Sequence, residues 1–443
     1  MLLKRTELRR ALGASAWLLG HRAVALATGL VGSVLVARYL GPADFGRLSF
    51  AIAFVALLGT VQHLGLVGLV TQALVREPEG RDEILGSVFA LKLLGGLAIV
   101  LIAIPVGYML ADTRAEWFLI SLVSFATLFE AGAIFRLYFE AEVQGRPVAI
   151  VMSAALLISL ALRIAAIALA APLWVFGVIF TAQVAMTSLG LWVGYNRRGH
   201  SVRRWRISAV RMRSLLSKSW PIMISSASAV VYLKIDQLML GKMNGMAGVG
   251  TYAVAARISE LTYALPTVLA GAIFPRLVQL HEQDRGRYDH RIRQSIDAMF
   301  WAGLCAAIGI SLISGPFIAL LFGAAYTGAG SILSIHIWAC PAMFMGIIVQ
   351  RWHMADNLQH LLIPRQVAGA AANVALNWLL IPSWGGIGAA IATVLSYTLA
   401  QYVLMFSHRR TRILGWWMTL AIFAPLSWLA AWRSENMGKA EAS

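Results

Sequence analysis

The amino-acid sequence predicts an all-α integral membrane protein, and three observations support that prediction. Of the 443 residues, 59% are apolar and 13% are charged, whereas charged residues make up about 25% of an average soluble domain. The mean hydropathy is +0.73. Apolar runs of roughly 20 residues, enough to cross about 30 Å of hydrocarbon, recur along most of the chain. A soluble enzyme, a nucleic-acid-binding protein and a disordered chain are therefore poor interpretations.

Twelve apolar runs predict twelve membrane-spanning helices, six on each side of one long polar stretch. In chain order the runs are Ala14–Ala37, Leu48–Val75, Ile84–Ala111, Trp117–Phe139, Val148–Ala171, Leu173–Tyr195, Ser219–Gly241, Val249–Phe274, Ala298–Phe322, Ser331–Gln350, Leu361–Ile381 and Ile387–Ser407. A thirteenth run, Ile413–Trp432, contains Pro425 and several Trp residues. Its length and composition suit either a spanning helix or a shorter helix lying in the membrane interface.

The distribution of Lys and Arg predicts which loops face the cytoplasm. With a cytoplasmic N-terminus, 26 of these residues fall on cytoplasmic loops and helix ends. The opposite side has only four, which are Arg38, Arg47, Arg114 and Lys242. The formal net charge of +17 therefore reflects membrane topology and gives no reason to expect a nucleic-acid partner.

The longest polar stretch, Asn196–Lys218, contains eight Lys or Arg residues with apolar residues between them. This pattern is typical of a positively charged anchor between two halves, and also of an amphipathic linker pressed against anionic lipid headgroups. The expected domains are an N-terminal six-helix lobe with its basic linker, residues 1–208, and a C-terminal six-helix lobe, residues 209–443. The second lobe includes the apolar segment 413–432.

Two glycine-rich segments indicate an internal repeat. The segment Arg38–Ala51 reads RYLGPADFGRLSFA, and 204 residues after its start the segment Lys242–Ala253 reads KMNGMAGVGTYA. Each has a basic residue, a glycine turn and an apolar-Gly-x-apolar pattern at the mouth of an even-numbered helix. Because both halves have six helices, they enter the membrane in the same sense, and the repeat predicts two lobes related by pseudo-symmetry.

Ionisable residues inside apolar runs are costly, so each is a functional candidate by default. The basic ones are His21, Arg22, Lys92, Arg163, Lys234 and Arg257, and the acidic ones are Glu130, Asp236 and Glu260. A basic interior suits an anionic substrate, because a phosphate or pyrophosphate group that leaves water needs cationic donors. We expect the five Lys and Arg residues to line a substrate cavity and the three carboxylates to be candidates for ion coupling.

Structural roles are the competing interpretation for several of these residues. Arg22 can pair with a buried carboxylate such as Glu130. Arg257 and Glu260 are three residues apart on one helix, so they can neutralise each other, and Asp236 can also lie near Arg257. No catalytic constellation, metal-ligand spacing or phosphate-binding loop is evident, and the expected outer loops are short. We therefore expect a protein that is not an enzyme and has no metal site and no cofactor.

Three blocks of sequence resemble bacterial polysaccharide flippases, the O-antigen and exopolysaccharide translocases. They are Leu40–Ala51, the region Asp236–Leu277 with GVGTYAVAARISE inside it, and Asn373–Tyr397 with GGIGAAIAT inside it. The likeness runs in register with the twelve-helix map over nearly the whole chain. Such proteins belong to the multidrug, oligosaccharidyl-lipid and polysaccharide transporter superfamily, whose members have twelve helices, so the thirteenth apolar run is a departure.

The resemblance implies two six-helix lobes around a central cavity in the bacterial inner membrane. It implies flipping of an undecaprenyl-pyrophosphate-linked oligosaccharide from the cytoplasmic to the periplasmic leaflet by alternating access. The expected partners are this lipid-linked oligosaccharide, membrane lipids and other polysaccharide assembly proteins, with no nucleic acid. Two alternatives are a cation-coupled multidrug extruder of the same superfamily, which the sign of the deep charges disfavours, and a non-transporting scaffold for polysaccharide export.

Overall fold

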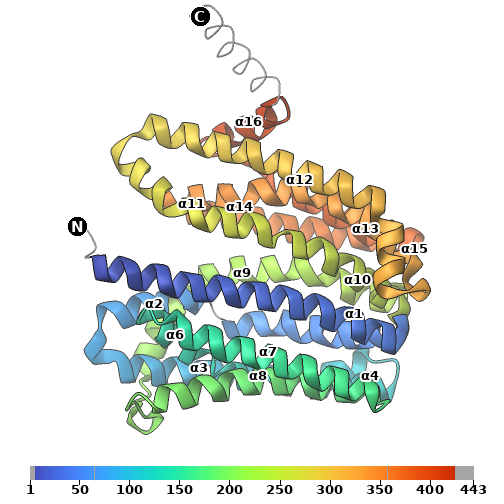
Figure 1. The fold of residues 1–443 in the computed structure, drawn as a ribbon, viewed down its shortest axis with the longest axis horizontal. Helices are drawn as coiled ribbons and strands as arrows, with labels where there is room; N and C mark the ends of the chain where they lie inside the picture. Colours follow the sequence, from blue (N-terminus) through green and yellow to red (C-terminus); the bar gives the residue numbers. More distant parts are fainter. Residues whose placement is uncertain (1–4, 64, 357, 425–443) are drawn as a thin grey trace, which may run out of the picture. The chain divides into compact units, whose positions relative to one another are not determined.

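The computed structural model describes residues 5–63, 65–356 and 358–424, and within these ranges the regular structure is entirely helical. The α-helices are α1 (Arg5–His63), α2 (Leu66–Arg76), α3 (Arg81–Leu110), α4 (Arg114–Ser124), α5 (Ala126–Glu130), α6 (Ala133–Ala141), α7 (Gly145–Ala168), α8 (Leu173–Asn196), α9 (Ala209–Met243), α10 (Met246–Thr262), α11 (Ala264–Gln283), α12 (Arg285–Phe322), α13 (Thr327–His336), α14 (Cys340–Ala355), α15 (Leu362–Gln401) and α16 (Arg412–Ala421). The predicted all-α fold class is confirmed (Figure 1).

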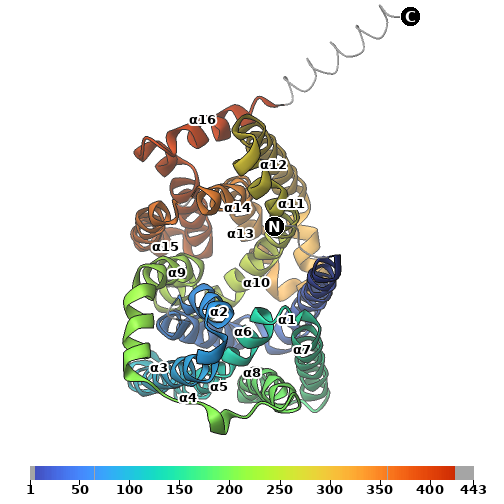
Figure 2. The same ribbon diagram turned by 90° about the vertical axis from the view of Figure 1, so that its left-hand side faces the viewer.

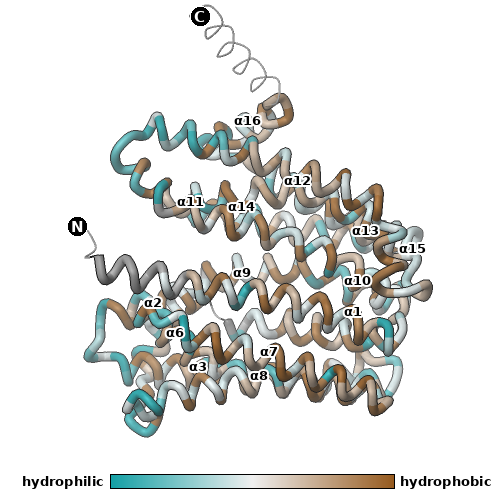
Figure 3. Tube along the Cα trace, viewed as in Figure 1, coloured by the Kyte–Doolittle hydropathy of each residue, from teal (hydrophilic) through white to brown (hydrophobic). Residues whose placement is uncertain are grey.

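Nine helical segments of the described chain are long and apolar enough to cross a membrane. Two further segments, Met246–Phe274 and Arg276–Gln283, are bent by 44° where they meet, and they provide a tenth span if they are counted together. Figure 3 shows apolar residues along the middle of the long helices and hydrophilic residues mainly towards their ends. This pattern is typical of helices that lie in hydrocarbon with their ends in water.

Two of these segments each join two of the runs predicted from the sequence. Helix α1 is broken at Gly41, with φ 72° and ψ 172°, directly before Pro42. Helix α15 is broken at Gly385, with φ 52° and ψ −129°. Glycine reaches positive φ without the steric cost of a side chain, so the chain can end one span and start the next there. The total of twelve spans stays a prediction.

Contacts divide the chain into two compact units, Met1–Val254 with Leu321–Ala325, and Ala255–Leu320 with Tyr326–Ser443. In the first unit α1 packs along α7 and α9, α7 along α8, and α3 along α4 (Figures 1 and 2). Because α9 packs along α1 and α3, it belongs by contacts to this unit, together with the first half of α10. The division into lobes after residue 208 stays a prediction.

In the second unit α11 packs against α14, and both α13 and α14 pack against α15. The side-chain amide of Asn373 donates to Ser396 Oγ (3.2 Å), which ties together the two halves of α15. Helix α16 buries Leu414 and Met418, and Trp301 Nε1 donates to the carbonyl of Ala421 (2.9 Å). The run predicted over 413–432 is thus helical as far as Ala421, and its part from residue 425 lies outside the described residues.

Ion pairs in the first unit join segments that the sequence assigns to the same side of the membrane. The pairs are Arg47–Glu116 (3.1 Å) and Lys242–Asp112 (2.9 Å) among the predicted outer segments, and Arg211–Glu77 (2.8 Å) among the predicted inner ones. The helix ends that each of these pairs joins therefore lie on the same side of the first unit, as the predicted topology requires. Which end faces the cytoplasm stays a prediction.

Candidate functional site

The ionisable residues expected inside the spans differ in burial. Lys92 and Asp236 are buried, each with 2% of its surface exposed. The half-buried ones are His21, Glu130, Arg163, Lys234 and Glu260, and the exposed ones are Arg22 and Arg257. Arg257 and Glu260 belong to the second unit, and the others belong to the first.

Arg163 on α7 lies against both α1 and α8. Its Nη2 donates to Gln183 Oε1 on α8 (3.3 Å). A Cβ atom added to Gly32 on α1 would lie 2.8 Å from Arg163 Nη1. The guanidinium therefore rests on the bare backbone of α1, and any side chain at position 32 would displace it.

The N-terminal part of α1 carries a second basic group. His21 Nδ1 lies 3.1 Å from Ser153 Oγ on α7, which links the two helices. The neighbouring Arg22 is exposed, and its charge acts on the His21 ring together with that of Arg136 on α6. Arg136 is a half-buried cation that the sequence analysis did not select.

Lys92 on α3 is a buried cation with compensating charge nearby. Its ammonium group is acted on by the carboxylate of Glu130 and, with opposite sign, by Arg136. A charge that leaves water is costly unless an opposite charge or hydrogen bonds replace the lost solvation. Arg22 is the partner of Glu130 that the sequence suggests, whereas in the structure the charge of Glu130 acts on Lys92.

Gln62 is a buried polar residue that is not among the candidates selected from the sequence. It is 1% exposed. Its Nε2 donates to the carbonyls of Lys92 (2.8 Å) and Thr127 (2.6 Å), so it ties α1 to α3 and α5. An amide within a long apolar run is the signal that could have identified it, because a buried amide must find hydrogen-bond partners.

Asp236 on α9 forms a short hydrogen bond with α10. The hydroxyl of Tyr252 donates to Asp236 Oδ2 at 2.5 Å, and both side chains are buried. Hydrogen bonds to ionised acceptors are shorter and stronger than neutral ones. The sequence analysis considered Arg257 as a neighbour of Asp236 and did not select Tyr252.

The second unit holds a charge cluster that no sequence motif indicated. Asp356, at the end of α14, accepts a hydrogen bond from Arg285 Nη1 (2.7 Å) and lies 3.3 Å from His281 Nε2. Tyr288 also donates to this carboxylate (3.4 Å). These contacts tie α14 to the junction of α11 and α12. About 70 residues separate the partners in the chain, so sequence spacing does not reveal the cluster.

Among the residues selected from the sequence, those of the first unit include more cations than acids. The Lys and Arg residues are Arg22, Lys92, Arg163 and Lys234, and the acids are Glu130 and Asp236. Cationic donors of this kind can bind phosphate oxygens. Among the described residues no group of three or more His, Cys, Asp or Glu is placed to hold a metal ion.

Comparison with known sequences gives one family match and several relatives. Residues 13–281 match the family described as polysaccharide biosynthesis protein. The chain is 28% identical over 186 residues to the probable low-salt glycan biosynthesis flippase Agl15 of Haloferax volcanii, which is 42% of this chain and 39% of that protein. It is 21% identical over 314 residues to the succinoglycan biosynthesis transport protein ExoT of Rhizobium meliloti, which is 68% of this chain and 60% of that protein. The matches thus span less than two thirds of these relatives' lengths.

Solved structures with a similar fold are membrane transporters. The lipid II flippase MurJ in an inward closed conformation superposes with a TM-score of 0.73 and 15% identity, over 94% of this chain and 93% of that chain. An inward-facing multidrug resistance MATE transporter of the MOP superfamily superposes with a TM-score of 0.70 and 15% identity, over 90% of this chain and 95% of that chain. At such low identity the likeness shows the fold.

Proposed function

Because this chain belongs to the polysaccharide biosynthesis protein family, we propose that it flips a lipid-linked oligosaccharide across the bacterial inner membrane. The proposed substrate is an undecaprenyl-pyrophosphate-linked oligosaccharide, which moves from the cytoplasmic to the periplasmic leaflet. Transport proceeds by alternating access through a cationic central cavity, with the N-terminus in the cytoplasm. The lipid-linked oligosaccharide, membrane lipids and other polysaccharide assembly proteins are the proposed partners.

The observation that supports this proposal best is the sign of the charges on the spans. Among the residues selected from the sequence, five Lys or Arg and one His stand against three carboxylates. A pyrophosphate carries several negative charges and loses its water when it enters the membrane, so cations must replace that water. A cavity that binds cationic drugs requires the opposite excess.

Arg163 is suited to the role of phosphate donor. A guanidinium has five N–H donors in a rigid plane whose geometry matches phosphate oxygens. Its contact with the backbone at Gly32 restricts where those donors point. Lys92, on which the charge of Glu130 acts, is proposed to supply a second positive charge.

Complementation tests the proposal directly. A bacterial strain whose own flippase gene is deleted is given the wild-type protein, Arg163→Ala, Arg163→Lys, Lys92→Met or the control Arg213→Gln, at matched membrane levels. Arg213 is an exposed arginine on α9 at the predicted cytoplasmic end. Surface polysaccharide is expected with wild type and control, to be lost with Arg163→Ala and Lys92→Met, and to return in part with Arg163→Lys.

A flipping assay with purified protein in vesicles avoids any dependence on the glycan that the host strain makes. Flipping of a fluorescent polyprenyl-pyrophosphate oligosaccharide is measured by its accessibility to a membrane-impermeant quencher. Flipping by every variant would refute the role of these cations. Absence of flipping by folded wild-type protein, both here and in the strain, would refute the proposed function.

One observation favours a second candidate, a cation-coupled drug extruder of the same fold. Asp236 is a buried carboxylate with a short hydrogen bond, and such groups are candidates for ion coupling in transporters. Ethidium efflux from cells that express the protein separates the two functions. Efflux that Asp236→Asn abolishes, without polysaccharide rescue by the wild type, would favour the extruder.

A further inference from the structure

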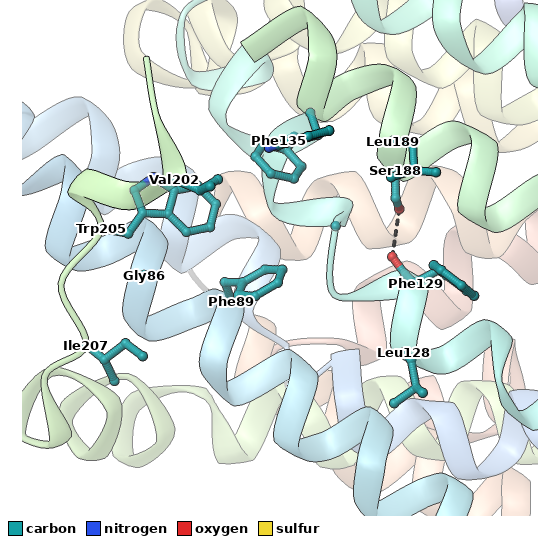
Figure 4. A pocket seen from close by; sticks show the side chains of 12 residues that line it. Gly86, Phe89, Leu128, Phe129, Phe135, Ser188, Leu189, Val202, Trp205 and Ile207 are labelled. Carbon is teal, nitrogen blue, oxygen red and sulfur yellow. Dashed lines mark hydrogen bonds between the residues drawn. The ribbon is translucent and has the colours of Figure 1, made fainter. Parts of the chain in front are cut away.

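The first unit has an apolar cavity of about 520 Å³ (Figure 4). It lies beside the linker between α8 and α9, which is residues 197–208. Its walls include the rings of Phe89, Phe129, Phe135, Trp192 and Trp205. The hydroxyl of Ser188, which also lines the cavity, donates to the carbonyl of Phe129 (2.7 Å), as the dashed line in Figure 4 shows. The wall is therefore mostly hydrocarbon, and its serine already has a hydrogen-bond partner, so the cavity suits an apolar guest.

The linker presents apolar and basic side chains in different directions. Val202, Trp205 and Ile207 line the cavity. The residues between them, Arg203, Arg204 and Arg206, are exposed. A segment of this kind places hydrocarbon contacts and a cluster of positive charge side by side, which is the arrangement that an anionic lipid requires.

The linker backbone is held firmly against α3. The backbone N–H of Arg206 donates to the carbonyl of Asp82 (3.2 Å), and that of Ser208 donates to Ser87 Oγ (3.0 Å). A Cβ atom added to Gly86 would lie 2.5 Å from the carbonyl oxygen of Arg206, so only glycine permits this approach. Trp205 is fixed as well, because its Nε1 donates to Tyr195 Oη (3.0 Å).

Three carboxylates near the linker, on α3 and the segment before it, have cationic partners. Arg211 lies 2.8 Å from Glu77 and 3.5 Å from Glu83, and Arg81 lies 3.9 Å from Asp82. Residues 197–208 of the linker contain five arginines and no Asp or Glu. Arg203, Arg204 and Arg206 are exposed, so their charges can act on an anion from outside the chain.

The cavity also lies at a depth that suits a lipid. Phe89 is eight residues after the start of α3, and Ser188 is eight residues before the end of α8. At a rise of 1.5 Å per residue, each is about 12 Å from its helix end. This is the depth at which an acyl chain begins beneath its headgroup, and tryptophan is enriched at this level.

We propose that this cavity and linker form a binding site for an anionic phospholipid of the leaflet predicted to be cytoplasmic. One acyl chain occupies the cavity among Phe89, Phe135 and Trp205. The phosphate lies outside it, bound by Arg203, Arg204 and Arg206. The site is separate from the proposed substrate cavity and does not depend on what the protein transports.

Native mass spectrometry of the purified full chain tests the site by counting bound lipids. The probes are phosphatidylglycerol and phosphatidylcholine with the same acyl chains. Wild type is compared with Arg203→Gln/Arg204→Gln/Arg206→Gln and with a control of equal charge change, Arg197→Gln/Arg213→Gln/Lys218→Gln, whose three residues are also exposed. At about 1 kcal/mol per basic residue near a membrane surface, the first triple variant should bind phosphatidylglycerol on the order of 100-fold more weakly.

The control triple variant should retain most of its phosphatidylglycerol binding, and phosphatidylcholine should bind wild type weakly. An equal loss in both triple variants would mean that diffuse charge attracts the lipid, and would overturn the proposal. Equal binding of the two lipids to wild type would do the same.

A second pair of variants tests the acyl chain. Leu128→Trp and Leu189→Trp each enlarge a side chain that lines the cavity and leave every arginine in place. Either variant that keeps the wild-type thermal unfolding midpoint should lose the bound phosphatidylglycerol. Retention of the lipid by such a folded variant would refute the cavity as its binding site. Displacement of phosphatidylglycerol by equimolar undecaprenyl phosphate would overturn the assignment to a phospholipid.

Discussion

Gly46 and Gly250, which occupy equivalent positions in the internal repeat, contact each other in the structure. A Cβ atom on Gly46 would overlap the carbonyl oxygen of Met246 and lie 2.9 Å from the backbone nitrogen of Gly250. A Cβ atom on Gly250 would overlap the carbonyl oxygen of Pro42 and lie 3.0 Å from the backbone nitrogen of Gly46. Because residues 42 and 246 are also 204 positions apart, the contact is reciprocal.

The turn glycine in each copy of the repeat has a positive φ. Gly41 has φ 72° and Gly245 has φ 80°, both in the left-handed region. The two copies thus each have a glycine with positive φ and pack against each other through Gly46 and Gly250. These features support the repeat seen in the sequence, and the pseudo-symmetry of the two lobes stays a prediction.

Substitution of either contact glycine should destabilise the protein. Gly46→Ala or Gly250→Ala puts a methyl group where a backbone carbonyl lies, and overpacking of this kind costs about 1–3 kcal/mol. The control is Gly59→Ala, since a Cβ at Gly59 meets nothing within 4 Å. Thermal unfolding in detergent should show a lower midpoint for both contact variants and no decrease for the control. An unchanged midpoint in Gly46→Ala would contradict the close contact.

The parts of the fold that the sequence predicts are those that depend on composition along one segment. Apolar runs mark the spans, and the Gly-Pro at residues 41 and 42 marks the first turn. The reciprocal contact of Gly46 with Gly250 was not predicted, because a repeat shows equivalence and does not show which copies touch.

The candidate site shows the same limit. The sequence selects Lys92 and Asp236, because a charge in an apolar run is conspicuous. It does not identify Tyr252 as a partner of Asp236, nor the Asp356 cluster, because those contacts join separate helices. Gln62 could be selected from the sequence as well, because an amide within an apolar run must find hydrogen-bond partners when it is buried.

Gly32 offers a way to test Arg163 without removing its charge. Gly32→Val should push the guanidinium off the backbone of α1, because Nη1 lies where the new Cβ would be. We expect loss of polysaccharide rescue with little loss of stability, since the far end of a flexible side chain can move. Gly20→Val on the same helix is the matched control, because a Cβ there meets nothing within 4 Å. Full rescue by Gly32→Val would argue against a fixed position for Arg163.

For the hydrogen bond between Tyr252 and Asp236 we expect an effect on stability and a separate effect on proton coupling. Tyr252→Phe removes a hydrogen bond to a buried carboxylate, which should lower the free energy of unfolding by about 1.5–3 kcal/mol. Asp236→Asn removes the titratable group, so any dependence of flipping on the proton gradient should disappear if Asp236 couples the two. Flipping in vesicles with and without an ionophore measures this. Wild-type gradient dependence that persists in Asp236→Asn would exclude Asp236 as the coupling group.

His200, in the linker after α8, predicts a pH dependence of stability. Its Nε2 lies 2.8 Å from the hydroxyl of Tyr138. Partial burial and the positive charge of Arg81 lower the pKa of His200 below its ordinary value of 6.5. The remaining charges that act on the ring are those of Asp82, Glu142 and Arg204. The unfolded chain therefore binds a proton at His200 more readily than the folded chain does.

Stability must then rise with pH wherever the unfolded state binds more protons. The contribution of His200 to the free energy of unfolding is fully present above pH 6.5, which is the pKa of His200 in the unfolded chain. It decreases as the pH falls from 6.5 towards the lower pKa that His200 has in the folded chain. Thermal unfolding midpoints of wild type and His200→Gln are compared between about pH 8 and pH 5. The wild-type midpoint should fall relative to the variant at the acidic end, because the two proteins differ only in the titratable group at position 200. Parallel curves for the two proteins would contradict the lowered pKa.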